Sequence, residues 1–356
     1  MSGIAGLLRI SDSTRKLVSI GEQVIFDAAN EYFAAHNADL QAAIRVFVEG
    51  TTEGFKSVYR LPGGGRLQRR GGQAPSGAVK TGGSWDVSFP LEDFGTQYAW
   101  SDIAMAYMTV ADLQLQIDTT RAQDMGTVRY EMLKALLNNT ARSFSDPLHG
   151  TLTIQPLANG DAVVYPPVIG SETETTDNHY RVSGYAASAI SDTNNPYETL
   201  RDELEEHSGT PSGYGNIAVF INPAQKAKTE LLTDYDQVSD VNIRSGQDAN
   251  IPINLPNVPG RILGRTNGVW VVEWRWTPSS YAMAVDLDSP GPLMKRRDPV
   301  DTGLGEGLQL VATNSEHPIT SSHYRHRFGF GVGNRLGAAV MFLDAGGSYT
   351  IPAIYA

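Results

Sequence analysis

The chain has 356 residues, of which 41% are hydrophobic and 19% are charged. This length and composition predict a folded protein of two or three domains and exclude a wholly disordered chain. There is no cysteine, which excludes disulfide frameworks, thiolate metal sites and cysteine nucleophiles. The formal net charge of -11 argues against tight, general binding to DNA phosphates, and solubility alone is enough to explain it.

Two targeting classes are also excluded by the sequence. No apolar run approaches the roughly 20 residues that a transmembrane helix needs. The N-terminal stretch MSGIAGLLRISDSTRK lacks a basic region followed by an apolar core, so it is not a signal peptide. We therefore expect a soluble protein that is made in a cytoplasm.

Two helices are predicted near the N-terminus. Apolar residues at helical spacing indicate a first helix over residues 21–35. Asn37 is interpreted as the N-cap of a second, short helix, which carries Leu40, Ile44 and Phe47 on one side. Neither helix carries an obvious catalytic or binding residue.

Residues 51–99 predict a long two-stranded finger. A strand-like piece, Phe55–Leu61, comes first, and a second strand alternates apolar and polar residues from Trp85 onward. The stretch between them, PGGGRLQRRGGQAPSGAVKTGG, is too long and too rich in glycine for an ordinary turn. Such a hairpin has no core of its own, so we expect it to pack on a neighbouring chain.

Residues 103–142 carry the best helical pattern in the chain. An apolar stripe with charged residues outside it predicts a helix from Thr109 to Asn139, about 45 Å long. Asp146-Pro147 and Gly150 are expected to close the region. A helix of this length is typical of a scaffold element.

Beyond residue 150, short strands and helices are predicted. Residues 151–195 indicate short strands around the acidic loop GSETETTDNHY. Asn195-Pro196 is expected to open a charged helix, and Asn222-Pro223 to cap a helix over Pro223–Leu232. Asn267-Gly268 predicts a hairpin turn. Strands are predicted at Ile217–Ile221, Arg261–Arg265, Val269–Trp276, Arg325–Phe330, Leu336–Phe342 and Tyr349–Ile351.

Two glycine-rich stretches resemble nucleotide-binding motifs but fail on spacing. A phosphate-binding loop needs its lysine directly after the second glycine, whereas Ala78 and Val79 separate Gly77 from Lys80. The glycine series 329–337 has the wrong register for a dinucleotide fingerprint, and no helix follows it. We interpret this series as a bulged or tightly packed strand.

Two acidic motifs resemble functional sites but lack residues that those sites require. Asp301-Thr302-Gly303 matches the aspartic protease triplet, but that mechanism needs two such aspartates, so we interpret it as a loop turn. Asp286 and Asp288 begin a calcium-loop pattern whose later ligand positions hold a proline and an arginine.

Histidines and tryptophans offer two further candidate sites. A histidine cluster near the C-terminus could hold a metal, but a spacing of three places two of its members on opposite faces of a strand. A stripe of tryptophans could stack on sugars, although packing against a helix is the commoner use. These residues are His317, His323 and His326, and Trp270, Trp274 and Trp276. We therefore predict no catalytic residue, no cofactor and no metal, and hence no enzyme.

The order of the predicted elements resembles one known family. An N-terminal segment, a glycine-tipped finger, a long helix, a mixed α/β region and terminal strands follow one another. This order, over nearly the whole chain, resembles the Hong Kong 97 type of capsid protein of tailed bacteriophages. The resemblance is carried by WDVSFPLEDFGTQYAWSDIAMAYM, GRILGRTNGVWVVEWRW, SYAMAVDLDSPGPLMKRRDP and HYRHRFGFGVGNRLGAAVMF.

The resemblance implies an α+β fold in five parts. These are an N-terminal arm with helices (1–50), an extended loop (51–99), a peripheral domain with a long spine helix (100–195), an axial domain (196–325) and return strands to the peripheral domain (326–356). The implied function is that of a major capsid protein, which assembles as pentamers and hexamers into the icosahedral head around double-stranded DNA. A net negative surface suits the lining of such a shell, because DNA must fill it without sticking.

The extended loop is implied to lie across an adjacent subunit. The residues expected at that contact are Arg66, Arg69, Arg70, Lys80 and Trp85. Exposed ion pairs contribute about 0–1 kcal/mol each, so shell strength should come from many repeated contacts. A solvated loop is the alternative for the arginines. Some relatives crosslink a loop lysine to an asparagine of another subunit, and Lys80 is the candidate here, although most relatives do not crosslink.

Partners and location also follow from the resemblance. Relatives with a built-in scaffolding segment are longer before the first helix, and few residues precede that helix here, so we expect a separate scaffolding protein. A portal is also expected, and a decoration protein stays open. DNA is expected inside the shell without sequence-specific binding, and no membrane is involved. The protein is expected in the virion after assembly in the host bacterial cytoplasm. Two alternatives stay open: an encapsulin shell with the same subunit fold, and a secreted glycan-binding or hydrolytic β protein supported only by the tryptophans.

Overall fold

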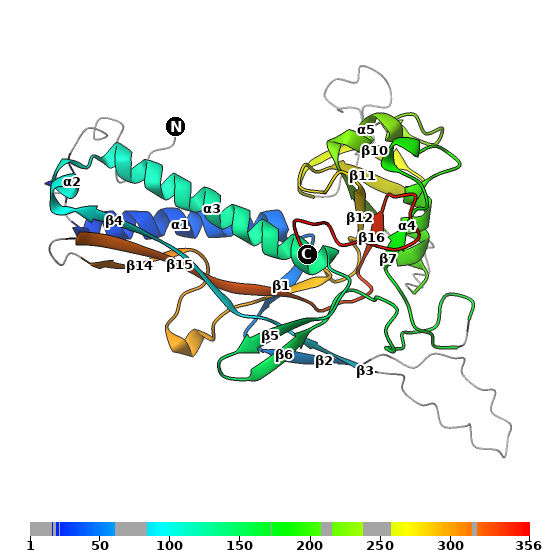
Figure 1. Cartoon of the computed structure of the whole chain (residues 1–356), viewed down its shortest axis with the longest axis horizontal. Helices are drawn as coiled ribbons and strands as arrows, with labels where there is room; N and C mark the ends of the chain where they lie inside the picture. Colours follow the sequence, from blue (N-terminus) through cyan, green and yellow to red (C-terminus); the bar gives the residue numbers. More distant parts are fainter. Residues whose placement is uncertain are drawn as a thin grey trace, which may run out of the picture.

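The structure, a computed structural model, describes residues 16, 19–20, 22–60, 84–171, 173–207, 216–237, 258–314 and 319–356. Within these residues the molecule is elongated (Figure 1). One end is an arm in which two long helices, α1 and α3, lie over the strands β4, β14 and β15. The other end holds a seven-stranded sheet with the short helices α4 and α5.

Helix α1 (Glu22–Ile44) runs without a break, so the prediction of two helices separated at Asn37 is wrong. Asn37 lies inside the helix and points its side chain at the backbone of Leu308. Its Nδ2 donates to Leu308 O at 3.2 Å, and its Oδ1 accepts from Leu308 N at 2.9 Å. An asparagine whose side chain hydrogen-bonds a distant backbone segment in this way has no need to end its own helix.

The long helix is confirmed. Helix α3 (Val110–Leu137) begins after the N-cap Thr109, whose side chain and backbone form a capping box with Asp112. The same pattern was predicted to extend back to residue 103, where the structure has a separate short helix, α2 (Asp102–Tyr107). At 1.5 Å per residue α3 is about 42 Å long.

The arm sheet is built on β15 (Ile319–Val332), the longest strand described. Along one edge it pairs with β4 (Glu92–Ser101), and along the other with β14 (Gln309–Asn314) and then β13 (Leu293–Arg296). Strand β1 (Val48–Thr52) completes the sheet by pairing in parallel with β13. Neither β1 nor β4 was predicted. The predicted boundary between residues 325 and 326 falls inside β15.

The arm has its own apolar core between helices and sheet. Phe33 of α1 and Ile117 of α3 are buried against Tyr324 of β15. A second, larger core joins the C-terminal half of α3 to both sheets through residues such as Met132 and Phe328. Because each core spans helices and strands from distant parts of the sequence, the arm is stabilised by packing along its whole length.

The seven-stranded sheet has the strand order β7-β16-β12-β8-β11-β10-β9. The predicted hairpin is confirmed, since Asn267 and Gly268 both have positive φ, as a tight two-residue turn requires. The predicted caps Asn195 and Asn222 are also confirmed, at the starts of α4 (Pro196–Glu205) and α5 (Pro223–Thr229). The strands are β7 (Tyr180–Val182), β8 (Ile217–Ile221), β9 (Asp236–Gln237), β10 (Arg261–Thr266), β11 (Val269–Glu273), β12 (Tyr281–Asp286) and β16 (Ala338–Phe342).

Two hairpins lie between these regions. Strand β2 (Lys56–Arg60) pairs with β3 (Ser84–Ser88), which confirms the two-stranded base of the predicted finger. Strand β5 (Arg142–Asp146) pairs with β6 (Gly150–Ile154), and the Asp146 carboxylate accepts from the backbone of Leu148 and His149 in the turn.

The C-terminal segment differs from the prediction at one place. Tyr349–Ile351 is not a strand. Tyr349 packs on Tyr180 instead, and its hydroxyl donates to the carbonyl of Leu137 at the end of α3. A β-prone tripeptide can thus be held in place by side-chain contacts, without pairing into a sheet.

The described residues contain no helix that is both long and apolar enough to cross a membrane.

Candidate functional site

The base of the finger is fixed within its own chain. Trp85 of β3 is only 7% exposed, stacks on Tyr59 of β2 and also contacts Tyr165. Arg296 of β13 donates to the carbonyl of Phe89 just beyond β3. Among the predicted contact residues, Trp85 therefore packs mainly inside the subunit. Arg66, Arg69, Arg70 and Lys80 lie outside the described residues.

The tip of the arm exposes large apolar side chains. Ile103 and Tyr107 of α2 and Leu115 of α3 are each close to 70% exposed. Single exposed apolar residues are ordinary, but three on two consecutive helices are candidates for contact with another protein chain.

The rejected motifs have structural roles. Asp301-Thr302-Gly303 forms a short 3-10 turn that ends at Gly303, which has positive φ, as predicted. The glycine series lies in and after β15, where a Cβ at Gly329 would meet Pro90 O at 2.2 Å, so the prediction of a tightly packed strand is confirmed. Trp274 is buried, and Trp270 and Trp276 are partly buried beside it in the large core. Strand β11 ends before Trp274, so the three tryptophans do not share a strand face.

One histidine of the predicted cluster belongs to a buried network in the arm. His326 and His323 lie on opposite faces of β15, as predicted, and His317 is outside the described residues. His326 Nδ1 lies 2.5 Å from Asp124 Oδ1 of α3, and His36 Nε2 of α1 lies 3.0 Å from Asp124 Oδ2. We call His36, Asp124, Lys295 and His326 the arm cluster.

The arm cluster is closed, in the sense that each ring nitrogen has a complementary partner. His326 Nε2 faces Lys295 Nζ at 3.4 Å, and His36 Nδ1 accepts from Arg121 Nε at 3.2 Å. Each ring therefore needs only one N–H group, the one that donates to Asp124. Burial alone raises the pKa of Asp124, but the hydrogen bonds from His326 and His36 outweigh it and lower the pKa to about 2.

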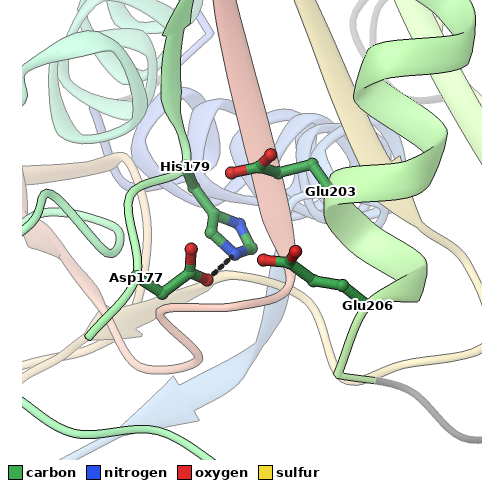
Figure 2. A group of neighbouring side chains, drawn as sticks. All are labelled: Asp177, His179, Glu203 and Glu206. Atoms are coloured by element: carbon green, nitrogen blue, oxygen red, sulfur yellow. Dashed lines mark ion pairs between the residues drawn. The ribbon is translucent and has the colours of Figure 1, made fainter. Parts of the chain in front are cut away.

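A second buried group lies at the edge of the seven-stranded sheet (Figure 2). Asp177 and His179 come from the chain just before β7, and Glu203 and Glu206 from the end of α4. Four potential ligand atoms, one from each residue, lie within 4.8 Å of one another. We call these four residues the axial cluster.

Two cationic side chains border the axial cluster. Arg181 holds Glu203 with two contacts of 2.7 Å, from Nε to Oε1 and from one terminal nitrogen to Oε2. His207 Nε2 lies 3.2 Å from Asp177 Oδ2 and 3.5 Å from Glu206 Oε1. The cluster is therefore rich in acidic groups whose charges are partly compensated.

The electrostatics of the axial cluster are uneven. Burial tends to raise the pKa of Asp177, but the neighbouring His179 and His207 side chains outweigh it and hold the pKa well below its ordinary range. Burial, and then the charges of Asp177 and Glu203, raise the pKa of Glu206 to about 7. The pKa of His207 is raised, because its carboxylate neighbours outweigh its burial. The neighbouring carboxylates thus disfavour a charge on Glu206 and favour a proton on His207.

The sequence analysis missed both clusters. The segment containing Asp177 and His179 was interpreted as a polar, acidic loop, and the helix containing Glu203 and Glu206 as merely charged. A signal was available, since Asp-x-His followed by two glutamates three residues apart on a helix is a recognisable set of metal-binding side chains. The arm cluster carried no local signal, because its members come from four separate elements.

Comparisons with known proteins support the fold. No family model matches the sequence, and no curated protein matches it. A solved structure of Mycobacterium phage Patience matches with a TM-score of 0.68 at 20% identity, covering 96% of this chain and 94% of that chain. The predicted mixed α and β fold of tailed-phage capsid proteins is therefore confirmed as a fold.

Weaker similarities accompany it. The capsid structure of the Cyanophage P-SCSP1u matches with a TM-score of 0.48 at 10% identity, covering 83% of this chain and 86% of that chain. A virus-like particle from Pyrococcus furiosus matches with a TM-score of 0.43 at 8% identity, covering 89% and 99%. These scores are below 0.5, so the fold assignment depends on the first structure.

Proposed function

We propose that the chain is the major capsid protein of a tailed phage, a shell subunit and not an enzyme. The observation that carries the proposal is the shared fold with a phage structure over 96% of this chain. An elongated subunit suits a shell, because its two ends meet different neighbouring copies and each contact repeats around the symmetry axes.

In this proposal the subunits form pentamers and hexamers of an icosahedral head that encloses double-stranded DNA in the virion. Assembly takes place in the host bacterial cytoplasm with a scaffolding protein and a portal. The net charge of -11 supports a lining that DNA fills without sequence-specific contacts.

The arm tip is proposed as a contact between copies. Full burial of a large apolar side chain is favourable by roughly 1.5–3 kcal/mol, and Ile103, Tyr107 and Leu115 are available for it. A shell repeats this contact in every subunit, so a modest gain per copy accumulates into a stable particle.

The extended loop is proposed as the second contact. Since Arg60 pairs with Ser84, the segment that connects them begins and ends at the same end of the β2–β3 hairpin. Arg66, Arg69, Arg70 and Lys80 belong to that connection and are proposed to reach an adjacent subunit. Boiled, denatured particles test the crosslinking alternative for Lys80, because a single monomer band would exclude it.

The arm-tip contact can be tested at one position with a matched pair of variants. Leu115→Asp places a charge in the contact, whereas Leu115→Met keeps an apolar side chain of similar volume. We expect Leu115→Asp to prevent sedimentation of shells through a sucrose gradient, and Leu115→Met to assemble like the unaltered chain. Far-UV circular dichroism should be the same for both. Normal assembly of Leu115→Asp would rule out this contact.

The encapsulin alternative shares the subunit fold, so the contents of the particle must decide. Double-stranded DNA inside particles purified from infected cells supports a phage head. A packaged enzyme in place of DNA supports a cellular compartment.

A further inference from the structure

The axial cluster has the composition of a metal site. It combines one imidazole nitrogen with three carboxylates, and three of its four residues are buried. Glu203 and Glu206 are three positions apart at the end of α4, so both side chains point from one face of the helix toward His179 (Figure 2). Sequence-distant residues thus converge on one small volume.

His179 provides an observation independent of the acidic residues. Its side chain is 1% exposed, and its Nδ1 lies 2.8 Å from the carbonyl oxygen of Ala338. A carbonyl only accepts hydrogen bonds, so Nδ1 carries a proton, and Nε2 is the ring nitrogen that could bind a metal. Metal-binding histidines are commonly oriented in this way, with the second nitrogen donating to a backbone carbonyl.

The Nε2 atom of His179 is aimed into the cluster without a matching partner. It lies 2.7 Å from Asp177 Oδ2, yet among the described residues it makes no hydrogen bond. The two atoms are close enough for an ion pair, but the geometry is not that of a hydrogen bond. A buried polar atom left in this state is costly, which is a reason to look for its missing partner.

The charges of the surroundings point to a divalent ion. The three carboxylates face one guanidinium, that of Arg181, and the His207 ring approaches two of them, Asp177 and Glu206. A cation among them would relieve the repulsion between neighbouring carboxylates. Glu206 is the member with the most exposed side chain, at 25%, so the site can be reached from solvent on its side. The C-terminal end of α4 adds a partial negative charge, which favours a cation.

We propose that Asp177, His179, Glu203 and Glu206 bind one divalent transition-metal ion, with Zn²⁺ as the best match. Imidazole together with carboxylates suits zinc, whereas calcium and magnesium prefer oxygen ligands alone. Four protein ligands close the coordination sphere, as in structural zinc sites. The ion ties the end of α4 to the chain entering β7 and so stabilises this edge of the seven-stranded sheet.

The test is isothermal titration of ZnCl₂ into the full-length, unassembled chain after treatment with EDTA and dialysis. We expect one Zn²⁺ per chain with a dissociation constant in the micromolar range or tighter. Glu206→Gln, at the exposed side of the site, should fold normally and weaken binding by about tenfold or more. Co²⁺ serves as a second probe, because its visible absorption reports nitrogen and oxygen coordination directly.

His149→Gln is the matched control, since His149 is exposed and lies outside the cluster. This variant should bind Zn²⁺ like the unaltered chain. The proposal fails if Zn²⁺ binds only at millimolar concentration, or if Glu206→Gln binds as tightly as the unaltered chain. It also fails if His179→Gln, folded by circular dichroism, keeps the Co²⁺ spectrum unchanged. None of these outcomes depends on whether the chain forms shells.

Discussion

The arm cluster and the axial cluster are built from similar parts and differ in how they are completed. In the arm, Asp124 accepts one hydrogen bond from each of two histidines, and Lys295 and Arg121 approach the remaining ring nitrogens. At the edge of the seven-stranded sheet, three carboxylates gather around one arginine, and His179 Nε2 has no hydrogen bond among the described residues.

The difference separates two uses of buried polarity. A closed network, in which donors and acceptors match, fixes the positions of the elements that contribute to it. A network of crowded carboxylates beside a buried nitrogen that makes no hydrogen bond can accept a cation. The arm cluster thus joins two helices to the arm sheet without further help, whereas the axial cluster is suited to hold an ion.

The largest expected effect is in the arm. Asp124→Asn removes the charge that both histidines face, and breaking a buried, charged network of this kind typically costs about 3 kcal/mol or more. Urea unfolding of the unassembled subunit measures this loss. Asp118→Asn on the same helix, where the exposed aspartate accepts a hydrogen bond from Tyr32, should cost about 1 kcal/mol or less. Equal losses for the two variants would show that the arm cluster has no special role.

Zn²⁺ should stabilise the chain through the axial cluster, and this stabilisation should not depend on the arm cluster. At a Zn²⁺ concentration a hundredfold above its dissociation constant, the free energy of unfolding should rise by about 2.7 kcal/mol. Asp124→Asn should keep this gain and His179→Gln should lose it, as measured by thermal unfolding with and without EDTA. A gain of the same size in His179→Gln would place the ion elsewhere.

In the absence of metal, replacing a carboxylate by an amide should change the free energy of unfolding in opposite directions in the two clusters. Glu206→Gln removes one of three neighbouring carboxylates, so it should stabilise the metal-free chain at pH 8 by about 1 kcal/mol once partial exposure is allowed for. Urea unfolding in EDTA measures the change. Destabilisation by Glu206→Gln under these conditions would mean that the axial cluster is already balanced.

The smallest expected effect is a pH dependence that comes from His326. Burial lowers the pKa of His326 below its ordinary value of 6.5, even though Asp124 acts in the other direction. The unfolded chain then binds a proton that the folded chain does not, so stability is retained above pH 6.5 and decreases as the pH falls below it. Thermal unfolding between pH 7.5 and pH 5, in small steps, should be less dependent on pH in His326→Gln. A steeper dependence in the variant would contradict this assignment.

Much of the fold could be predicted, because its strongest signals are local. The capping residues Asn195 and Asn222 and the turn at Asn267-Gly268 each act within a few residues, and the structure has the expected element at every one. Asn37 carried the same type of signal and misled, since its partner, Leu308, is 271 positions away.

The missed features depend on long-range pairing. Strand β4 exists because it pairs with β15, and its exposed residues alternate with half-buried ones that face the arm helices. Asp124 meets His36 across 88 positions and His326 across 202. Patterns within a short window cannot report such contacts, so the sequence indicated the fold and the general role but neither buried cluster.

The shell role itself is tested most directly by negative-stain electron microscopy of the purified chain, with and without a co-expressed candidate scaffolding protein. We expect closed icosahedral particles, or regular sheets and tubes of hexamers, with the scaffolding protein improving closure. A stable monomer or small dimer under all conditions, from a chain that is folded by circular dichroism, would contradict the account.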